Sequence, residues 1–266
     1  MASAFDERLR ALRDEGRKLL VCYLPLGDPA LGDRVDRAGE LLRCGADVLE
    51  LGMPCREPAL DGRVVAESMG RALGEGSGGD PYEDIERIRS AYPHSALQVM
   101  TYWELVVETG VETFAERVAA SGADAVLCPN APEDERGQLA ACLQRKGLAL
   151  LDFVRLDSSA DELARISKRA EGYAFMQAVH GKTGVAAHGE SDRVGANIAR
   201  MRSFGSSIPH CAGFGISRPE DVARYISVGA DGVIIGSALL LAMLDGNVER
   251  FLTPIREELD RGRIAK

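Results

Sequence analysis

Two carboxylates lie near each other in a sequence context that is unusual for charged side chains. Glu50 stands inside the apolar run DVLELGM, and Asp61 follows in a loop that contains Pro54 and Pro58. Charged groups are rarely buried unless they are paired or functional, and burial raises the pKa of a carboxyl group. A pair of this kind can serve as acid and base on one substrate. A buried ion pair at Glu50 and a plain Asp-Gly turn at Asp61 are the structural alternatives.

Three segments late in the chain are rich in glycine and follow apolar runs. They read HGKTG at 180–184, GFGIS at 213–217 and GS at 236–237. Glycine lets backbone N–H groups approach an anion, and the N-terminus of a following helix favours negative charge. We therefore predict a phosphate site made by Gly184, Gly213, Gly215, Gly236 and Ser237, with Ser237 also capping a helix. Tight turns between strands and helices would require similar glycines.

The histidines and cysteines give weaker signals. The histidines His94, His180, His188 and His210 show no metal-binding spacing, and none of the six cysteines forms a C-x-x-C pair. We therefore expect no metal site and no cofactor. His180, beside the first glycine segment, is a candidate acid, base or phosphate contact, or else a solvated loop residue. Tyr102 is a candidate for an aromatic substrate pocket, with a core position as the alternative.

The elements that must position these residues alternate along the chain. Eight apolar runs lie at 19–26, 47–53, 96–102, 124–129, 148–154, 173–179, 209–215 and 231–237. Continuous apolar character is typical of strands that are buried on both faces. Helical patterns separate the runs, and the phrases CGAD, SGAD and VGAD recur where a helix passes into a strand. We predict an α/β fold, a single (β/α)8 TIM barrel over residues 1–266 with an N-terminal helix across one end; a doubly wound sheet is the alternative.

Charge and composition narrow the functional class. Lys and Arg number 32 against 41 Asp and Glu, so the net charge is −9. An acidic chain is a poor candidate for binding nucleic acid or an anionic membrane. The N-terminal segment lacks the apolar core of a signal peptide, and no run approaches the roughly 18 apolar residues that span a membrane. We expect a cytoplasmic protein whose cysteines are buried and reduced.

The motifs LGDP, LELGMP-x3-PALDG, MTYWE, GKTG, GFGIS and GSA resemble, in order and spacing, those of the tryptophan synthase α subunit family. The resemblance runs from about residue 19 to residue 242. It implies a (β/α)8 barrel lyase that cleaves indole-3-glycerol phosphate to indole and glyceraldehyde 3-phosphate by a retro-aldol reaction. It implies that Glu50 protonates indole C3 and handles the glycerol hydroxyl proton, and that Asp61 holds the indole N–H. The implied pocket and mobile-loop positions are Tyr102, Leu127, Phe175, Phe214, Thr183 and His180.

The sequence departs from the family pattern at positions that face the substrate or the partner. Residues 55–57 read CRE where the family has Phe-Ser-Asp, and Arg63 replaces a proline. Phe175 replaces a pocket tyrosine, and Asn130 replaces an aspartate. Because the loop at 55–63 normally signals to the β subunit, we expect weak or no coupling to such a partner. Two alternatives remain: carbon–carbon bond chemistry on another phosphorylated substrate, and a non-catalytic binding barrel.

Overall fold

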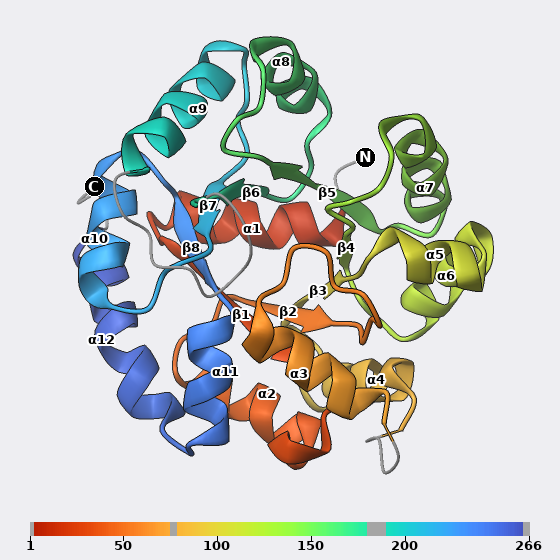
Figure 1. Cartoon of the computed structure of the whole chain (residues 1–266). Helices are drawn as coiled ribbons and strands as arrows, with labels where there is room; N and C mark the ends of the chain where they lie inside the picture. Colours follow the sequence, from red (N-terminus) through yellow and green to blue (C-terminus); the bar gives the residue numbers. More distant parts are fainter. Residues whose placement is uncertain (1–2, 75–78, 180–189, 263–266) are drawn as a thin grey trace.

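The computed structural model describes residues 3–74, 79–179 and 190–262 (Figure 1). Eight parallel strands pair in sequence order from β1 to β8, and β8 pairs back with β1, so the sheet closes into a barrel. Helices surround this barrel. The predicted (β/α)8 fold is therefore confirmed, and the alternative of an open doubly wound sheet is wrong.

Each strand lies inside one of the eight predicted apolar runs. The strands are β1 Leu19–Pro25, β2 Val48–Gly52, β3 Ala96–Met100, β4 Ala125–Leu127, β5 Ala149–Val154, β6 Ala174–Gln177, β7 His210–Gly213 and β8 Gly232–Ile235. Every strand residue except Phe153 is buried. Side chains fill the inside of the barrel and helices cover the outside, so the strands have no polar face.

Most of the helices connect successive strands, whereas α1 precedes β1 and α11 and α12 follow β8. They are α1 Ala4–Asp14, the short 3-10 helix η1 Pro29–Leu31, α2 Arg34–Arg43, α3 Arg63–Ala72, α4 Pro81–Ala91, α5 Trp103–Thr109, α6 Val111–Ala120, α7 Glu133–Arg145, α8 Ala160–Arg169, α9 Ser191–Ser203, α10 Pro219–Ser227, α11 Ser237–Leu244 and α12 Val248–Arg261. None of the helices in this described part of the chain is long and apolar enough to cross a membrane. All six cysteines are free, and five of them are buried.

The three repeated Gly-Ala-Asp joints share one structural role. The glycines Gly45, Gly122 and Gly229 follow α2, α6 and α10 with φ of 94°, 86° and 103°, which is the left-handed region that glycine adopts readily. The aspartates that follow, Asp47, Asp124 and Asp231, each accept a hydrogen bond from a backbone N–H of the preceding strand. The donors are Leu20, Leu97 and His210, at 2.9, 2.8 and 3.0 Å. The repeat therefore fixes helix ends and strand starts at one end of the barrel.

The N-terminal helix α1 lies across that same end, behind the strands in Figure 1. Ser3 and Asp6 form a capping box that begins the helix. Phe5 is fully buried, and its ring centroid lies 6.3 Å from that of Tyr173. Arg8 pairs with Asp124 at 3.3 Å. With this end covered, the carboxyl ends of the strands are left to form a site.

Candidate active site

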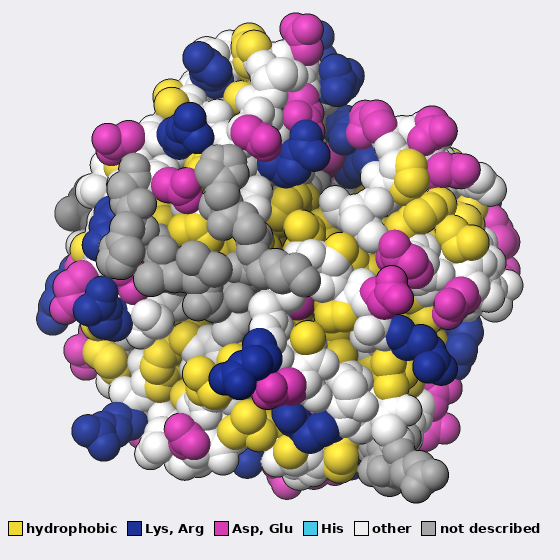
Figure 2. Space-filling view, in the orientation of Figure 1, with side chains coloured by type: hydrophobic (Ala, Val, Ile, Leu, Met, Phe, Trp, Pro, Cys, Tyr) yellow, Lys and Arg dark blue, Asp and Glu magenta, His cyan; other side chains and the backbone are white. Residues whose placement is uncertain are grey.

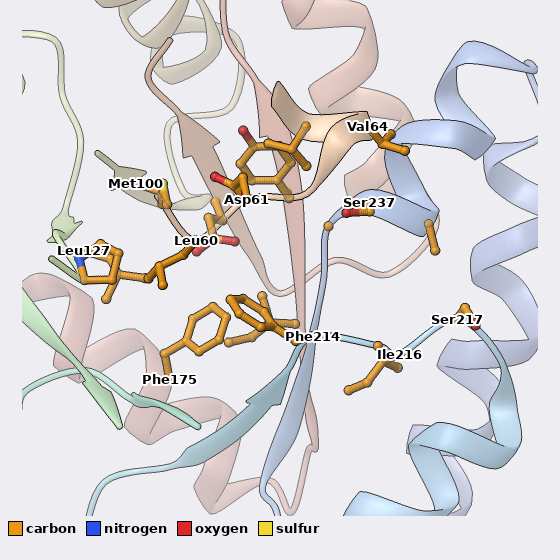
Figure 3. A pocket seen from close by; sticks show the side chains of 18 of the residues that line it. Leu60, Asp61, Val64, Met100, Leu127, Phe175, Phe214, Ile216, Ser217 and Ser237 are labelled. Carbon is orange, nitrogen blue, oxygen red and sulfur yellow. The ribbon is translucent and has the colours of Figure 1, made fainter. Parts of the chain in front are cut away.

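A pocket of about 260 Å³ opens at the carboxyl ends of the strands. Its wall changes in character along its length: Leu127 and Phe175 lie at one end, and Ile216 and Ser237 lie at the other (Figure 3). Asp61 lies between the two ends. In the space-filling view, apolar side chains are visible in the hollow near the centre of the face, and most charged side chains lie toward the edge (Figure 2). This arrangement suits an elongated ligand with one apolar end.

Glu50 lines the pocket from β2, and only 4 % of it is exposed. The side-chain amide of Gln98, its register partner on β3, donates a hydrogen bond from Nε2 to Glu50 Oε1 at 3.1 Å. Burial raises the pKa of Glu50 to about 7; the hydrogen bond from Gln98 opposes this rise, and the charge of Asp61 adds to it. Glu50 can therefore both give and accept a proton near neutral pH.

Asp61 lies in the loop between β2 and α3, is buried, and lines the same pocket. The Tyr102 hydroxyl donates a hydrogen bond to Asp61 Oδ2 at 2.7 Å and accepts one from the backbone N–H of Leu60 at 3.2 Å. Tyr102 was predicted to line the pocket, but it is fully buried and is absent from the described residues of the pocket wall. The structure therefore places Tyr102 behind Asp61, as a support for that carboxylate.

The apolar end of the pocket contains a cluster of three aromatic rings. Phe153, Phe175 and Phe214 all line the pocket, with ring centroids 5.2 Å apart for Phe153 and Phe175 and 5.7 Å apart for Phe175 and Phe214. Leu127 from β4 also lines the pocket. Aromatic rings stack or meet edge to face at such distances, so a flat apolar ring of a ligand fits here. Phe153 was not predicted, because its β5 run carries no signal beyond hydrophobicity.

Gly213, which was predicted to bind phosphate, packs against an aromatic ring. A Cβ atom at Gly213 would lie 2.4 Å from Cζ and 2.5 Å from Cε1 of Phe175, closer than atoms can approach. Gly213 is also absent from the described residues that line the pocket. The glycine is required because the Phe175 ring lies against β7. Its contact with an anion stays a prediction.

The polar end of the pocket is formed by Gly215, Gly236 and Ser237. The helix α11 begins at Ser237 and its N-cap is Gly236, so the prediction that Ser237 caps this helix is wrong. The Ser237 hydroxyl is buried and has no hydrogen-bond partner among the described residues. A buried hydroxyl without a partner is costly, and an anionic oxygen here would meet both this hydroxyl and the N-terminus of α11.

Tyr23, on β1, is a pocket residue that sequence reasoning missed. It is the register partner of Glu50, and its ring lies over Gly52, where a Cβ atom would be 2.2 Å from the Tyr23 hydroxyl. This hydroxyl is buried without a hydrogen-bond partner in the described part of the chain. Burial, with the nearby charges of Asp61 and Glu50, raises the pKa of Tyr23 well above its usual value. Tyr23 is therefore a neutral phenol in the wall beside Glu50.

Three predicted site residues lie outside the described residues: Gly184, Thr183 and His180. Of the other predicted residues, Tyr102 and Gly213 are not among the described residues of the pocket wall. The rest all line one pocket: Glu50, Asp61, Gly215, Ser237, Gly236, Leu127, Phe175 and Phe214. Within residues 3–74, 79–179 and 190–262, no group of three or more His, Cys, Asp or Glu side chains is arranged to hold a metal ion. The pocket thus brings together carboxylates, aromatic rings and a helix N-terminus.

Comparison with known proteins identifies relatives over nearly the whole chain. The family model of the tryptophan synthase alpha chain matches residues 9–256. The chain is 34% identical to the tryptophan synthase alpha chain of Xylella fastidiosa strain M12, over 96% of this chain and 97% of that one. It is also 34% identical to that of Xanthomonas campestris pv. campestris strain B100, over 98% and 97% of the two chains.

Solved structures give the same result for the fold. A structure of Mycobacterium tuberculosis tryptophan synthase superposes with a TM-score of 0.87 at 27% identity, covering 100% of both chains. The tryptophan synthase subunit alpha of Legionella pneumophila str. Paris superposes with a TM-score of 0.84 at 26% identity, covering 98% of this chain and 100% of that one. The family predicted from the motifs is confirmed. This chain belongs to the tryptophan synthase alpha chain family, whose members are lyases that cleave indole-3-glycerol phosphate to indole and glyceraldehyde 3-phosphate.

Proposed function

We propose that this lyase cleaves indole-3-glycerol phosphate in the pocket over Glu50 and Asp61. The observation that carries this proposal is a buried glutamate with a pKa of about 7, in a pocket that is aromatic at one end and lined by Ser237 at the other. The indole ring would lie against Phe153, Phe175 and Phe214. The phosphate would lie at the N-terminus of α11, where backbone N–H groups and the Ser237 hydroxyl are donors.

The reaction requires one proton to be delivered and one to be removed. Protonated Glu50 gives its proton to indole C3, and Asp61 accepts a hydrogen bond from the indole N–H while positive charge develops on the ring. Glu50, now a carboxylate, takes the proton from the glycerol hydroxyl adjacent to C3. The bond between C3 and that carbon breaks, its electron pair returns to the indole ring, and the hydroxyl-bearing carbon becomes the aldehyde. Glu50 ends the cycle protonated, so the protons balance.

Indole release from indole-3-glycerol phosphate tests this proposal. We expect turnover by the unmodified chain and a loss of about 10²–10⁴-fold in Glu50→Gln, because the amide cannot transfer the proton. Glu86→Gln, at an exposed glutamate on α4, is the matched control and should retain full activity. Glycerol 3-phosphate binding should be the same in all three proteins.

Two results would contradict the assignment. Full activity in Glu50→Gln would exclude Glu50 as the proton donor. Binding of glycerol 3-phosphate without any indole release would indicate a different phosphorylated substrate, with only the phosphate site retained.

We further propose that coupling to a tryptophan synthase beta subunit is weak or absent. Alpha chains of this family normally partner with that subunit. In this chain the loop between β2 and α3 carries exposed Arg56 and Glu57, which a partner would have to desolvate. Addition of a beta subunit should leave the rate of indole release unchanged, and the two proteins should elute separately. Stimulation or co-elution would refute this proposal.

A further inference from the structure

A buried amide connects the carboxyl group of Glu50 to a tyrosine on the other side of the barrel. Gln98 on β3 donates from Nε2 to Glu50 Oε1 at 3.1 Å, and the hydroxyl of Tyr173, just before β6, donates to Oε1 of Gln98. Gln98 and Tyr173 are both 0 % exposed. Neither is among the described residues that line the pocket. The two residues therefore act on Glu50 from inside the barrel and not through contact with a ligand.

The direction of these hydrogen bonds determines which end of the Gln98 amide faces Glu50. A glutamine amide carries an acceptor oxygen and a donor NH₂ group, and it can rotate to exchange them. Because the Tyr173 hydroxyl donates to the amide oxygen, the NH₂ group is directed toward Glu50. A donor favours the ionised form of a carboxyl group. The bond from Gln98 is made to Glu50 Oε1, so Oε2 is the oxygen that we assign to the proton in transit.

The other titratable groups that face Glu50 all disfavour its ionised form or are neutral. Asp61 raises the pKa of Glu50 through its charge. Tyr23 on β1 and Tyr173 have pKa values held well above the usual value by burial, and burial also raises the pKa of the Cys22 thiol on β1. All three are therefore neutral near pH 7. Gln98 is thus the group on the described residues that offsets the burial of this carboxyl.

We propose that Gln98, oriented by Tyr173, is a positioning residue that holds the Glu50 carboxyl in one orientation and keeps both its protonated and its ionised form accessible. The proposal rests on the proposed function, because it assigns to Glu50 a role that needs both forms. Gln98 was not predicted as a site residue, although a polar residue inside the apolar run ALQVM is the same signal that identified Glu50.

The test combines two variants of the network with a matched control. Gln98→Met keeps the length of the side chain and removes the donor, and Tyr173→Phe removes only the hydroxyl that orients the amide. Tyr225→Phe is the control, because Tyr225 is also fully buried and donates to a backbone oxygen, that of Ala178, at 3.2 Å. The titration of Glu50 is followed by carbon-13 NMR of glutamate side-chain carboxyls, with its signal identified by its loss in Glu50→Gln. The pH profile of kcat/KM for indole release is measured in parallel.

We expect the Glu50 midpoint in Gln98→Met to rise by about one pH unit, because a donor to the charged form has been lost. The descending limb of the kcat/KM profile should move to higher pH with it. Tyr173→Phe should shift the NMR midpoint and this limb in the same direction, but by less. Tyr225→Phe should lower Tm without moving the Glu50 midpoint or the limb of the kcat/KM profile. Unchanged midpoints in Gln98→Met and Tyr173→Phe would overturn the proposal. The NMR titration is independent of turnover, so an inactive chain with a shifted midpoint would contradict the proposed function and leave the role of Gln98 standing.

Discussion

At Glu50, burial, one hydrogen bond and one neighbouring charge act on the same carboxyl group. Burial and the charge of Asp61 raise its pKa, and the hydrogen bond from Gln98 lowers it, leaving it at about 7. A group with a pKa near the working pH is an effective proton carrier, because both forms are present. The site chemistry therefore depends on the residues that surround Glu50 as much as on Glu50 itself.

The pH dependence of the reaction follows from this value. Because Glu50 must be protonated to deliver a proton to indole, kcat/KM should fall as the pH rises through about 7. Measurement of indole release across this range would show a descending limb with that midpoint. The affinity for glycerol 3-phosphate, measured at the same pH values, controls for ionisation of the substrate. A profile that is flat through pH 7 would show that Glu50 is not the acid.

Individual site residues differed in how well they could be predicted from the sequence. Glu50 was identifiable because a carboxylate inside an apolar run needs a reason to be there, and Asp61 because it follows in the loop after the same run. The position of Tyr102 was not, because a strand-end residue can point into a pocket or support a loop, and the spacing is the same for both. The position of Tyr23 could not be predicted either. Its hydroxyl is buried without a partner among the described residues, and its ring fits there because Gly52 of the neighbouring strand has no side chain.

At the scale of elements, the turns after β7 and β8 form the polar end of the pocket, and β4, β5 and β6 contribute to its apolar end. Strand positions were predictable because strands buried on both faces give continuous apolar runs. The runs extended past the strand ends, since apolar residues such as Phe214 continue into the turns that line the pocket. The functions of single glycines were less predictable: Gly215 lines the pocket, whereas Gly213 makes room for a ring.

The contact between β6 and β7 gives a prediction for Gly213. Gly213→Ala places a methyl group 2.4 Å from Cζ of Phe175, so the ring must move and the protein should lose about 1–3 kcal/mol of stability. Denaturant unfolding measures this loss. Phe175→Leu combined with Gly213→Ala should recover part of it, because the clashing ring is absent. Gly137→Ala, in the exposed part of α7 with open space around it, is the control and should be neutral or slightly stabilising. Equal effects at both glycines would contradict the packing role.

The start of α11 gives a second prediction at this scale. Ser237→Ala removes a buried hydroxyl that has no protein partner among the described residues, so Tm should stay the same or rise slightly. If that hydroxyl binds phosphate, the affinity for glycerol 3-phosphate should fall about tenfold, which is the effect of losing one hydrogen bond to a charged group. Calorimetric titration and thermal melting measure the two quantities. Reduced Tm with unchanged affinity would assign Ser237 to packing alone.

At the scale of the whole molecule, the two ends of the barrel have separate tasks. The pocket occupies the carboxyl ends of the strands, and the aspartates of the repeated joints hold the other end together. Asp231 accepts a hydrogen bond from the backbone of His210 on β7 and pairs with Lys18, before β1, and Arg202 on α9. It therefore links elements from both ends of the chain where β8 meets β1. The repeat was visible in the sequence, but these partners, distant along the chain, were not.

The stability of the protein in acid should depend on the contacts of Asp231 where β8 meets β1. Burial alone would raise the pKa of Asp231, but hydrogen bonds from His210 and the charges of Arg202 and Lys18 lower it to about 2, below the unfolded value of 3.8. A carboxyl group with a lowered folded-state pKa stabilises the protein above the unfolded pKa, and this contribution is lost as the pH falls through the folded pKa.

Asp231→Asn should therefore reduce Tm at neutral pH, and the difference in Tm from the unmodified chain should shrink between about pH 4 and pH 2. Asp157→Asn, at a side chain that is 63% exposed, is the control and should leave Tm nearly unchanged at each pH. A Tm difference for Asp231→Asn that is independent of pH would show that the aspartate acts through its shape and hydrogen bonds and not through its charge.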